Sequence, residues 1–175
     1  MDKKRDLDVI VFLEPSYIDG KCYAHHVKSI TVFAVNMLRG KGYYFMKKEP
    51  FSFISLSRLI HLFSDFRTLI FYNAPAQCEL LEQLNIFNPN DRRFKIKVID
   101  LMTMYSEQAE VLPDWVTCED DPNRRADKEE AFYYGGYSYK WQKLKTATAD
   151  YGYKKQDKYK MENPIHVVEA TRFFI

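Results

Sequence analysis

The sequence has little cysteine and no long apolar run. Its 3 cysteines, Cys22, Cys78 and Cys118, lie far apart and form no C-x-x-C pair, so neither a disulfide framework nor a zinc finger is indicated. The charged N-terminal residues MDKKRDLD are followed by an apolar run that is too short for a secretory signal or a membrane span. We therefore expect a cytoplasmic protein with reduced cysteines and no membrane partner.

The chain also lacks an excess of charge of either sign. It has 26 basic and 24 acidic residues, a formal net charge of +2, so its overall electrostatics neither requires nor excludes a nucleic-acid partner. Aromatic residues are abundant instead, with 13 Tyr and 13 Phe among 175 residues. This composition and length predict a single domain over residues 1–175 whose core is rich in Phe and Tyr.

Two kinds of hydrophobic periodicity alternate along the chain. Apolar runs bounded by turn residues predict five strands, at residues 7–14, 21–37, 43–46, 68–72 and 95–100. Apolar residues spaced by three and four predict five helices, beginning at Ser52 and at Pro75 and covering 101–106, 139–151 and 165–174. Periodicity is lost at about 107–136, where EDDPNRRADKEEA predicts a charged surface loop.

The order of these elements predicts the fold. Three strands joined by turns form an antiparallel meander, and the later strands each follow a helix, which places them parallel in the same sheet. This is the ribonuclease H-like arrangement of the α/β class. We expect a mixed five-stranded sheet, antiparallel in its first three strands and parallel in the last two, with helices on its faces.

Polar residues stand where three of the predicted strands end. Glu14, Asn73 and Asp100 follow the first, fourth and fifth strands, and the stretch from Tyr72 to Glu79 joins a strand end to a helix start. Ligands commonly bind at such a junction in α/β proteins. Several carboxylates there could hold two divalent ions for phosphoryl transfer, to which Glu79 and Glu169 would add oxygens unless they are solvated helix residues.

Five motifs in order carry a resemblance to a known family. They are VFLEPS at 11–16, FYNAPAQCELLEQL at 71–84, VIDLMTMY at 98–105, YKWQKLKTATADYGY at 139–153 and NPIHVVEATRFF at 163–174. In order and spacing they resemble the DEDD superfamily of 3'-5' exonucleases, of the proofreading and ribonuclease T type. The resemblance implies Mg²⁺ or Mn²⁺ held by Glu14, Asp100 and Glu169, with His166 as general base.

The resemblance breaks at most of the catalytic positions. The first aspartate of the family falls on Phe12, the second on Gln77 and the last, counted from His166, on Thr171. Aligning the last acid on Glu169 instead displaces the histidine by two positions. An aromatic ring cannot bind a cation and an amide is a neutral ligand, so we expect a degenerate exonuclease-like domain that has lost the standard reaction.

A zinc-binding alternative follows from the same fold. The Maelstrom domain replaces the family acids by a Glu-Cys-His-Cys zinc set, and Glu14, Cys78 and His166 could supply three of those ligands. No cysteine follows His166 to supply the fourth.

The strongest binding feature in the sequence is near the C-terminal end. Residues 140–160 contain seven lysines and two aspartates, and residues 133–159 contain seven of the 13 tyrosines. Lysines interleaved with aromatic rings suit single-stranded DNA or RNA, although they also suit a solvated helix face. The candidate nucleic-acid contacts are Asn73, Gln77, Lys140, Lys143, Lys145, Lys154 and Lys155.

Three functions therefore remain open at the level of sequence. The first is a domain without the standard catalysis that binds nucleic acid or a protein partner. The second is an active metal-dependent exonuclease with a rearranged site built on Glu14, Asp100 and Glu169, with Glu79 as an optional fourth acid and His166 as candidate general base. The third is a module that binds only proteins, for which binding of oligonucleotides should show no dependence on salt.

Overall fold

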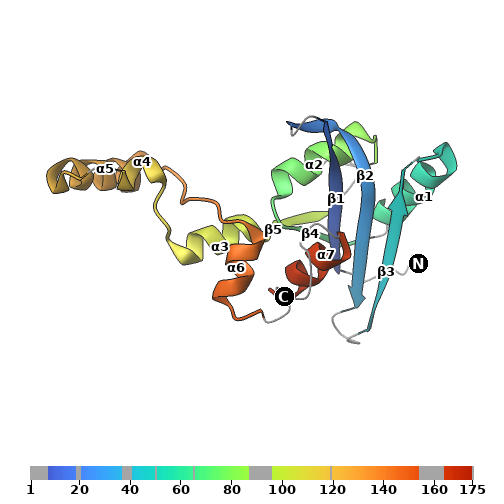
Figure 1. Ribbon diagram of the computed structural model, residues 1–175. Coiled ribbons are helices and arrows are strands. Elements are labelled where there is room, and N and C mark those ends of the chain that lie inside the picture. The colour runs from blue at the N-terminus through green and yellow to red at the C-terminus, as the bar shows by residue number, and fades with distance from the viewer. Residues whose placement is uncertain are drawn as a thin grey trace.

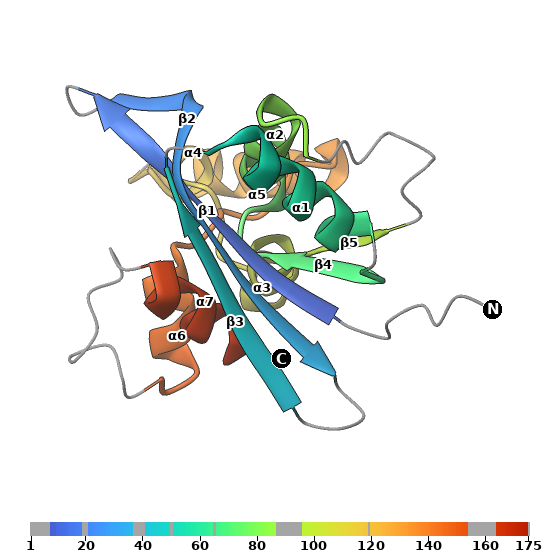
Figure 2. The same ribbon diagram turned by 90° about the vertical axis from the view of Figure 1, so that its right-hand side faces the viewer.

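The computed structural model describes residues 8–18, 21–36, 41–49, 51–64, 66–86, 96–118, 120–153 and 164–174. Within them, five strands form one open sheet in the order β3-β2-β1-β4-β5 (Figures 1 and 2). The strands are β1 (Asp8–Ile18), β2 (Lys21–Asn36), β3 (Lys41–Lys48), β4 (Thr68–Phe71) and β5 (Lys97–Asp100). The first three pair antiparallel, and β4 pairs parallel with both β1 and β5. The predicted α/β class and the mixed five-stranded sheet are confirmed.

Strand β1 lies at the centre because both of its faces are apolar. Val9, Val11 and Leu13 point to one face, and Ile10 and Phe12 to the other, as the alternation of a strand requires. Burial on both faces needs helices on both sides of the sheet. The chain supplies them from segments that lie before and after the later strands.

Helices α1 (Phe53–Ser64) and α2 (Ala74–Gln83) cover the face of the sheet that carries the larger apolar cluster. Leu59 and Phe63 of α1 and Leu81 of α2 are almost wholly buried there. Helix α7 (Pro164–Arg172) packs on β1 and β2 from the opposite face, where Val168 meets Ile10 in a smaller cluster. The fold therefore has three layers, with α1 and α2 on one face of the sheet and α7 on the other (Figure 2).

Helix α3 (Leu101–Ala109) begins directly after β5, and α6 (Leu144–Asp150) returns to lie near it (Figure 1). The helix predicted for 139–151 begins only at Leu144. The backbone N–H of Lys140 donates to the carbonyl of Val111 at 2.8 Å, and the carbonyl of Gln142 accepts from the Tyr72 hydroxyl at 2.7 Å. Residues 137–143 form neither helix nor strand, and these tertiary hydrogen bonds hold the backbone there against the local helical spacing.

The charged loop predicted at 107–136 is wrong, because most of that segment is helical. Helix α4 (Asp114–Thr117) is followed by α5 (Pro122–Gly135). The Asp121 side chain caps α5 by accepting from the backbone N–H of Asn123 at 3.0 Å, and Pro122 occupies the first turn. Gly136, with φ of 71°, ends the helix in the left-handed conformation that glycine adopts most easily.

We call residues 114–139, which comprise α4, α5 and the tyrosines after them, the arm. Figure 1 shows α5 away from the sheet, and in the described part of the chain its main packing partner is α4. No helix in the described ranges is long and apolar enough to cross a membrane.

Candidate functional site

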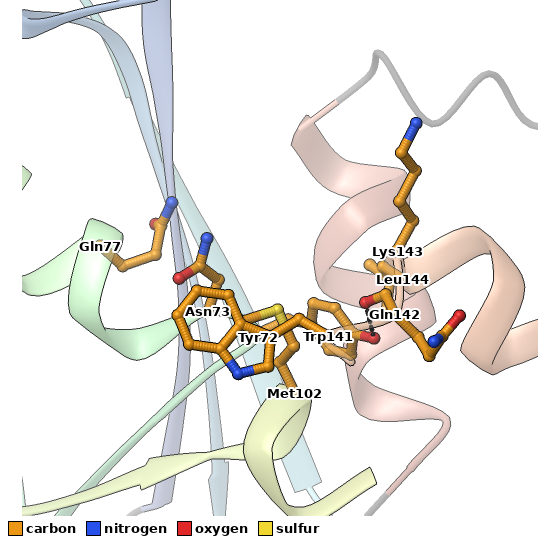
Figure 3. Close-up of a pocket in the computed structure, with 8 residues that line it drawn as sticks. All are labelled: Tyr72, Asn73, Gln77, Met102, Trp141, Gln142, Lys143 and Leu144. Carbon is orange, nitrogen blue, oxygen red and sulfur yellow. Dashed lines mark hydrogen bonds between the residues drawn. The ribbon is translucent and has the colours of Figure 1, made fainter. Parts of the chain in front are cut away.

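A pocket of about 380 Å³ lies at the carboxyl end of β4, at the turn that connects this strand to α2 (Figure 3). It is lined by residues of the turn after β4, of α2, of α3 and of the segment that leads into α6: Tyr72, Asn73, Gln77, Met102, Trp141, Gln142, Lys143 and Leu144. Pockets of this size are typical of small-ligand sites, and the position at a strand end is the one expected for α/β sheets. The stretch from Tyr72 to Glu79 was predicted as the functional junction and provides three of the lining residues.

The turn that forms the pocket floor depends on Asn73. This residue caps α2 with φ of 71° and ψ of 63°, a left-handed conformation that asparagine tolerates better than most side chains. Its backbone N–H donates to the Asp100 carboxylate at 3.0 Å, and its carbonyl accepts from the N–H of Gln77 at 3.2 Å. The Asn73 side chain makes no capping hydrogen bond and lines the pocket next to Gln77 (Figure 3).

Gln77 is tied to the backbone of β1. Its Oε1 accepts from the Leu13 N–H at 2.7 Å, and its Nε2 donates to the Leu13 carbonyl at 3.2 Å. Strand β4 pairs with β1 only as far as Ile10, so the Leu13 groups lie beyond the last β4 partner. The Gln77 amide thus satisfies the two Leu13 backbone groups, as a residue of a neighbouring strand would. Gln77 is nearly buried, with 7% of its surface exposed.

Asp100 is a capping residue in this structure. Its Oδ1 accepts from the backbone N–H of Met102 at 3.1 Å as well as from that of Asn73, and its Oδ2 accepts from the Thr103 hydroxyl at 2.8 Å. These bonds satisfy donors at the start of α3 and fix the α2 turn to the end of β5. Both carboxylate oxygens therefore already have protein partners.

The other predicted acids lie on different elements. Glu14, half-buried on β1, accepts a hydrogen bond from the Ser29 hydroxyl at 2.7 Å, across the pairing of β1 with β2. Glu169 lies on α7, where its Oε2 is buried and accepts no hydrogen bond from the described part of the chain. His166 lies one turn earlier on that helix and is partly exposed.

These acids are not brought together as a metal site. Across the residues that the structure describes, no three His, Cys, Asp or Glu side chains lie close enough to hold one metal ion. This holds for the predicted metal set of Glu14, Asp100 and Glu169, and also for the zinc alternative with Cys78 and His166. Their catalytic and metal-binding roles, and the use of Mg²⁺ or Mn²⁺, stay predictions from the family resemblance.

The other residues that the resemblance aligns with family aspartates take part in packing. Phe12 joins the smaller apolar cluster between the sheet and α7. Thr171 is buried on α7, and its hydroxyl donates to the carbonyl of Val167 one turn earlier at 2.7 Å. With Gln77 bonded to β1, all three residues that the resemblance aligns with family aspartates hold the fold together instead.

The predicted lysines are divided among several environments. Lys143 is exposed on the pocket rim, and Lys145 is exposed on the first turn of α6. Lys140 forms an exposed ion pair with Asp114 at 2.6 Å, of a kind that adds little stability. Lys154 and Lys155 lie outside the described residues.

Four pocket residues were missed by the sequence reasoning: Met102, Trp141, Gln142 and Leu144. Trp141 falls within the helix predicted for 139–151, but it lies before α6 and 58% of its surface is exposed, and its indole lies beside Asn73 and Met102 (Figure 3). The available signal was its position next to the lysines. An exposed indole in a pocket that also carries a lysine is typical of surfaces that stack on flat, charged ligands.

An aromatic cluster adjoins the pocket and shares Tyr72 with it. Tyr72, Tyr105, Tyr151 and Phe174 join β4, α3, α6 and the end of α7, with ring centroids 5.5 to 6.3 Å apart. The Tyr105 hydroxyl donates to the Asp150 carboxylate at the end of α6. Burial raises the pKa of Tyr72 far above its ordinary value, and burial with the Asp150 contact raises that of Tyr105 to about 12.

The raised pKa of Tyr105 predicts a loss of stability in alkali. An unfolded tyrosine ionises near pH 10, so the bias towards folding is complete below that pH and is lost as pH rises to about 12. The difference in unfolding free energy between wild type and Tyr105→Phe should therefore be constant up to about pH 10 and fall above it. Urea titrations at a series of pH values measure this difference. A difference that stays level through pH 12 would show that the hydroxyl is not protected in the fold.

No family model, curated protein or solved structure matches this chain.

Proposed function

We propose that this chain is a ribonuclease H-like, exonuclease-like domain that binds single-stranded nucleic acid at the pocket and has lost the standard 3'-5' exonuclease reaction. The observation that carries the binding proposal is that exposed Trp141 and exposed Lys143 both line one strand-end pocket. In the resembling family this end of the sheet is where nucleic acid is cut. The fold assignment itself rests on the strand order and on the motif resemblance.

The loss of catalysis is supported by what Gln77 does. A metal ligand must offer a free oxygen to the ion, and the Gln77 oxygen accepts from Leu13 instead. Restoring an aspartate there would shorten the side chain and remove the donor to the Leu13 carbonyl. Phe12 and Thr171, at two further family positions, offer no carboxylate. A two-metal mechanism needs several such oxygens around both ions.

The pocket lining suits an unpaired base with its phosphate. A base can stack on the Trp141 indole because every base has a π-face, and a flanking phosphate can reach the exposed ammonium of Lys143. The Asn73 side chain, which caps nothing, can hydrogen-bond to a base edge. DNA and RNA share these features, and the comparison of the two belongs to the experiment.

Titration of fluorescently labelled oligo-dT and oligo-U tests the binding. We expect Trp141→Ala to weaken binding by about tenfold or more, because stacking contributes roughly 1–3 kcal/mol per base. Lys143→Ala should reduce the slope of log K against log salt by about 0.7, the value for one phosphate of a single strand. Phe53→Ala is the control, since that aromatic ring is 85% exposed at the start of α1 and lies outside the pocket lining.

Two results would contradict the proposal. Oligonucleotide binding that is absent, or that ignores salt and the Trp141 change, would favour a module that binds only proteins. Trimming of the oligonucleotide from its 3' end in Mg²⁺ or Mn²⁺, abolished by Glu14→Ala, would instead establish the active exonuclease.

A further inference from the structure

Asn73 combines an unusual backbone conformation with an unused side chain. It caps α2 with φ of 71° and ψ of 63°, whereas an N-cap residue ordinarily has an extended backbone that turns its side chain onto the helix N–H groups. Asp100 and Asp121 have that extended conformation and cap α3 and α5 with their carboxylates. The Asn73 side chain makes no capping hydrogen bond, so its amide has no such role at the start of its own helix.

The backbone at position 73 suits glycine better than asparagine. Glycine adopts a positive φ without the clash that a Cβ atom brings, and Gly136 ends α5 at the same φ of 71°. Residues in sparsely populated backbone conformations concentrate at ligand sites. An asparagine that caps nothing at such a position points to a ligand for its amide.

Three amide side chains line the pocket, and two of them are engaged by the protein. The Nε2 atoms of Gln77 and Gln142 donate to backbone carbonyls, at 3.2 and 3.1 Å. Asn73 lies beside the Trp141 indole (Figure 3). A base stacked on that indole can therefore present its edge to an amide that offers a donor and an acceptor side by side.

We propose that Asn73 selects the base that stacks on Trp141 and that this base is adenine, a role that rests on the proposed binding of single-stranded nucleic acid. The N6 amino group of adenine is a donor with an acceptor on each side, N1 on one edge and N7 on the other, so an amide can pair with either edge. Guanine offers two adjacent acceptors, O6 and N7, on the second edge, and a pyrimidine has only one suitable edge. A purine also covers more of the indole than a pyrimidine does.

The rest of the lining fits an adenine nucleotide. Among the described residues that line the pocket, Lys143 is the only charged one, and its exposed ammonium suits a phosphate. The thioether of Met102 adapts to the shape of an apolar ring. The Asp100 carboxylate, which could favour a base with two donors, already accepts hydrogen bonds from protein groups at both oxygens.

Labelled oligonucleotides that carry one base, A, G, C or T, between abasic positions test this selection. We expect wild type to bind the adenine strand about tenfold more tightly than the others, because a bidentate amide pair discriminates bases by roughly that factor. Asn73→Gly should lose the preference, since glycine keeps the left-handed turn and removes only the amide. Asn85→Gly is the matched control and should keep it, because Asn85 also has a positive φ, of 54°, but is exposed outside the pocket lining.

Asn73→Asp provides a test by reversal. A carboxylate has no donor for adenine, but its two oxygens can accept from the N1–H and N2–H groups of guanine together. This variant should therefore bind the guanine strand more tightly than the adenine strand. Urea denaturation confirms that each variant is folded.

Three results would overturn the adenine selection. Wild type that binds all four strands equally, while binding still depends on Trp141 and on salt, would end the selection and leave the proposed function standing. An adenine preference that persists in Asn73→Gly would assign the selection to another residue. Absence of binding to every strand would overturn both proposals together.

Discussion

Replacing Gln77 by alanine is expected to lower the free energy of unfolding by about 3 kcal/mol, the largest effect that we predict for a single change in the pocket. The substitution leaves the N–H and the carbonyl of Leu13 without their Gln77 partners, which lie at 2.7 and 3.2 Å. Each buried polar group that loses its partner costs roughly 1–3 kcal/mol, and water admitted to the cavity would recover part of this.

Urea denaturation of Gln77→Ala measures the effect, with Glu79→Ala as its matched control. Glu79 is exposed two residues later on α2, and its replacement should change stability by no more than about 0.5 kcal/mol. Equal losses in the two variants would show that the Gln77 contact to β1 does not stabilise the fold.

Gln77→Glu adds a pH-dependent version of the same test. A protonated carboxyl can reproduce both hydrogen bonds, because its hydroxyl donates and its carbonyl accepts, but an ionised one cannot donate to the Leu13 carbonyl. Burial should raise the folded-state pKa of the introduced glutamate above its unfolded value of about 4.3. The variant should then match wild type most closely below about pH 4 and lose stability as pH rises. A loss of stability that is the same at all pH values would contradict this account.

The order of the elements and the place of the site could be predicted because both follow from local patterns. Val9 to Leu13 form a continuous apolar run that only a strand buried on both faces explains, and the break at Asn73 marks the end of β4. Strand ends in such a sheet meet at one edge. The pocket lined by Tyr72, Asn73 and Gln77 lies there.

The roles of the polar residues at the site could not be predicted from local sequence patterns. Gln77 bonds to Leu13 only because the pairing of β4 with β1 stops at Ile10, and this register is a tertiary property. Trp141 is exposed because Val111 and Tyr72 engage the backbone on either side of it and delay α6. The prediction of a loop at 107–136 was wrong for another reason. The sequence contains the Asp121 cap and the Gly136 stop of α5, but α5 has no apolar stripe, and the loop was predicted from that lack.

Replacing Asp100 by alanine is expected to lower the free energy of unfolding by about 2–3 kcal/mol, because hydrogen bonds to a charged acceptor contribute more than neutral ones. The change removes the acceptor for the N–H groups of Asn73 and Met102 and for the hydroxyl of Thr103. Asp100→Asn keeps one oxygen for the N–H groups and should cost about 1 kcal/mol. Glu107→Ala, an exposed change on the same helix, is the control.

The same variants distinguish a capping carboxylate from a metal ligand. If Asp100 acts through its cap, the loss in Asp100→Ala is the same in EDTA and in Mn²⁺, since the bonds to Asn73, Met102 and Thr103 need no ion. If Asp100 is instead a metal ligand, Mn²⁺ should raise the stability of the wild type as its concentration increases, and Asp100→Ala should lose this Mn²⁺-dependent gain. Thermal unfolding in both buffers separates the two. A Mn²⁺-dependent gain in thermal stability that the wild type shows and Asp100→Ala lacks would indicate that Asp100 binds a metal ion, and would support the active exonuclease.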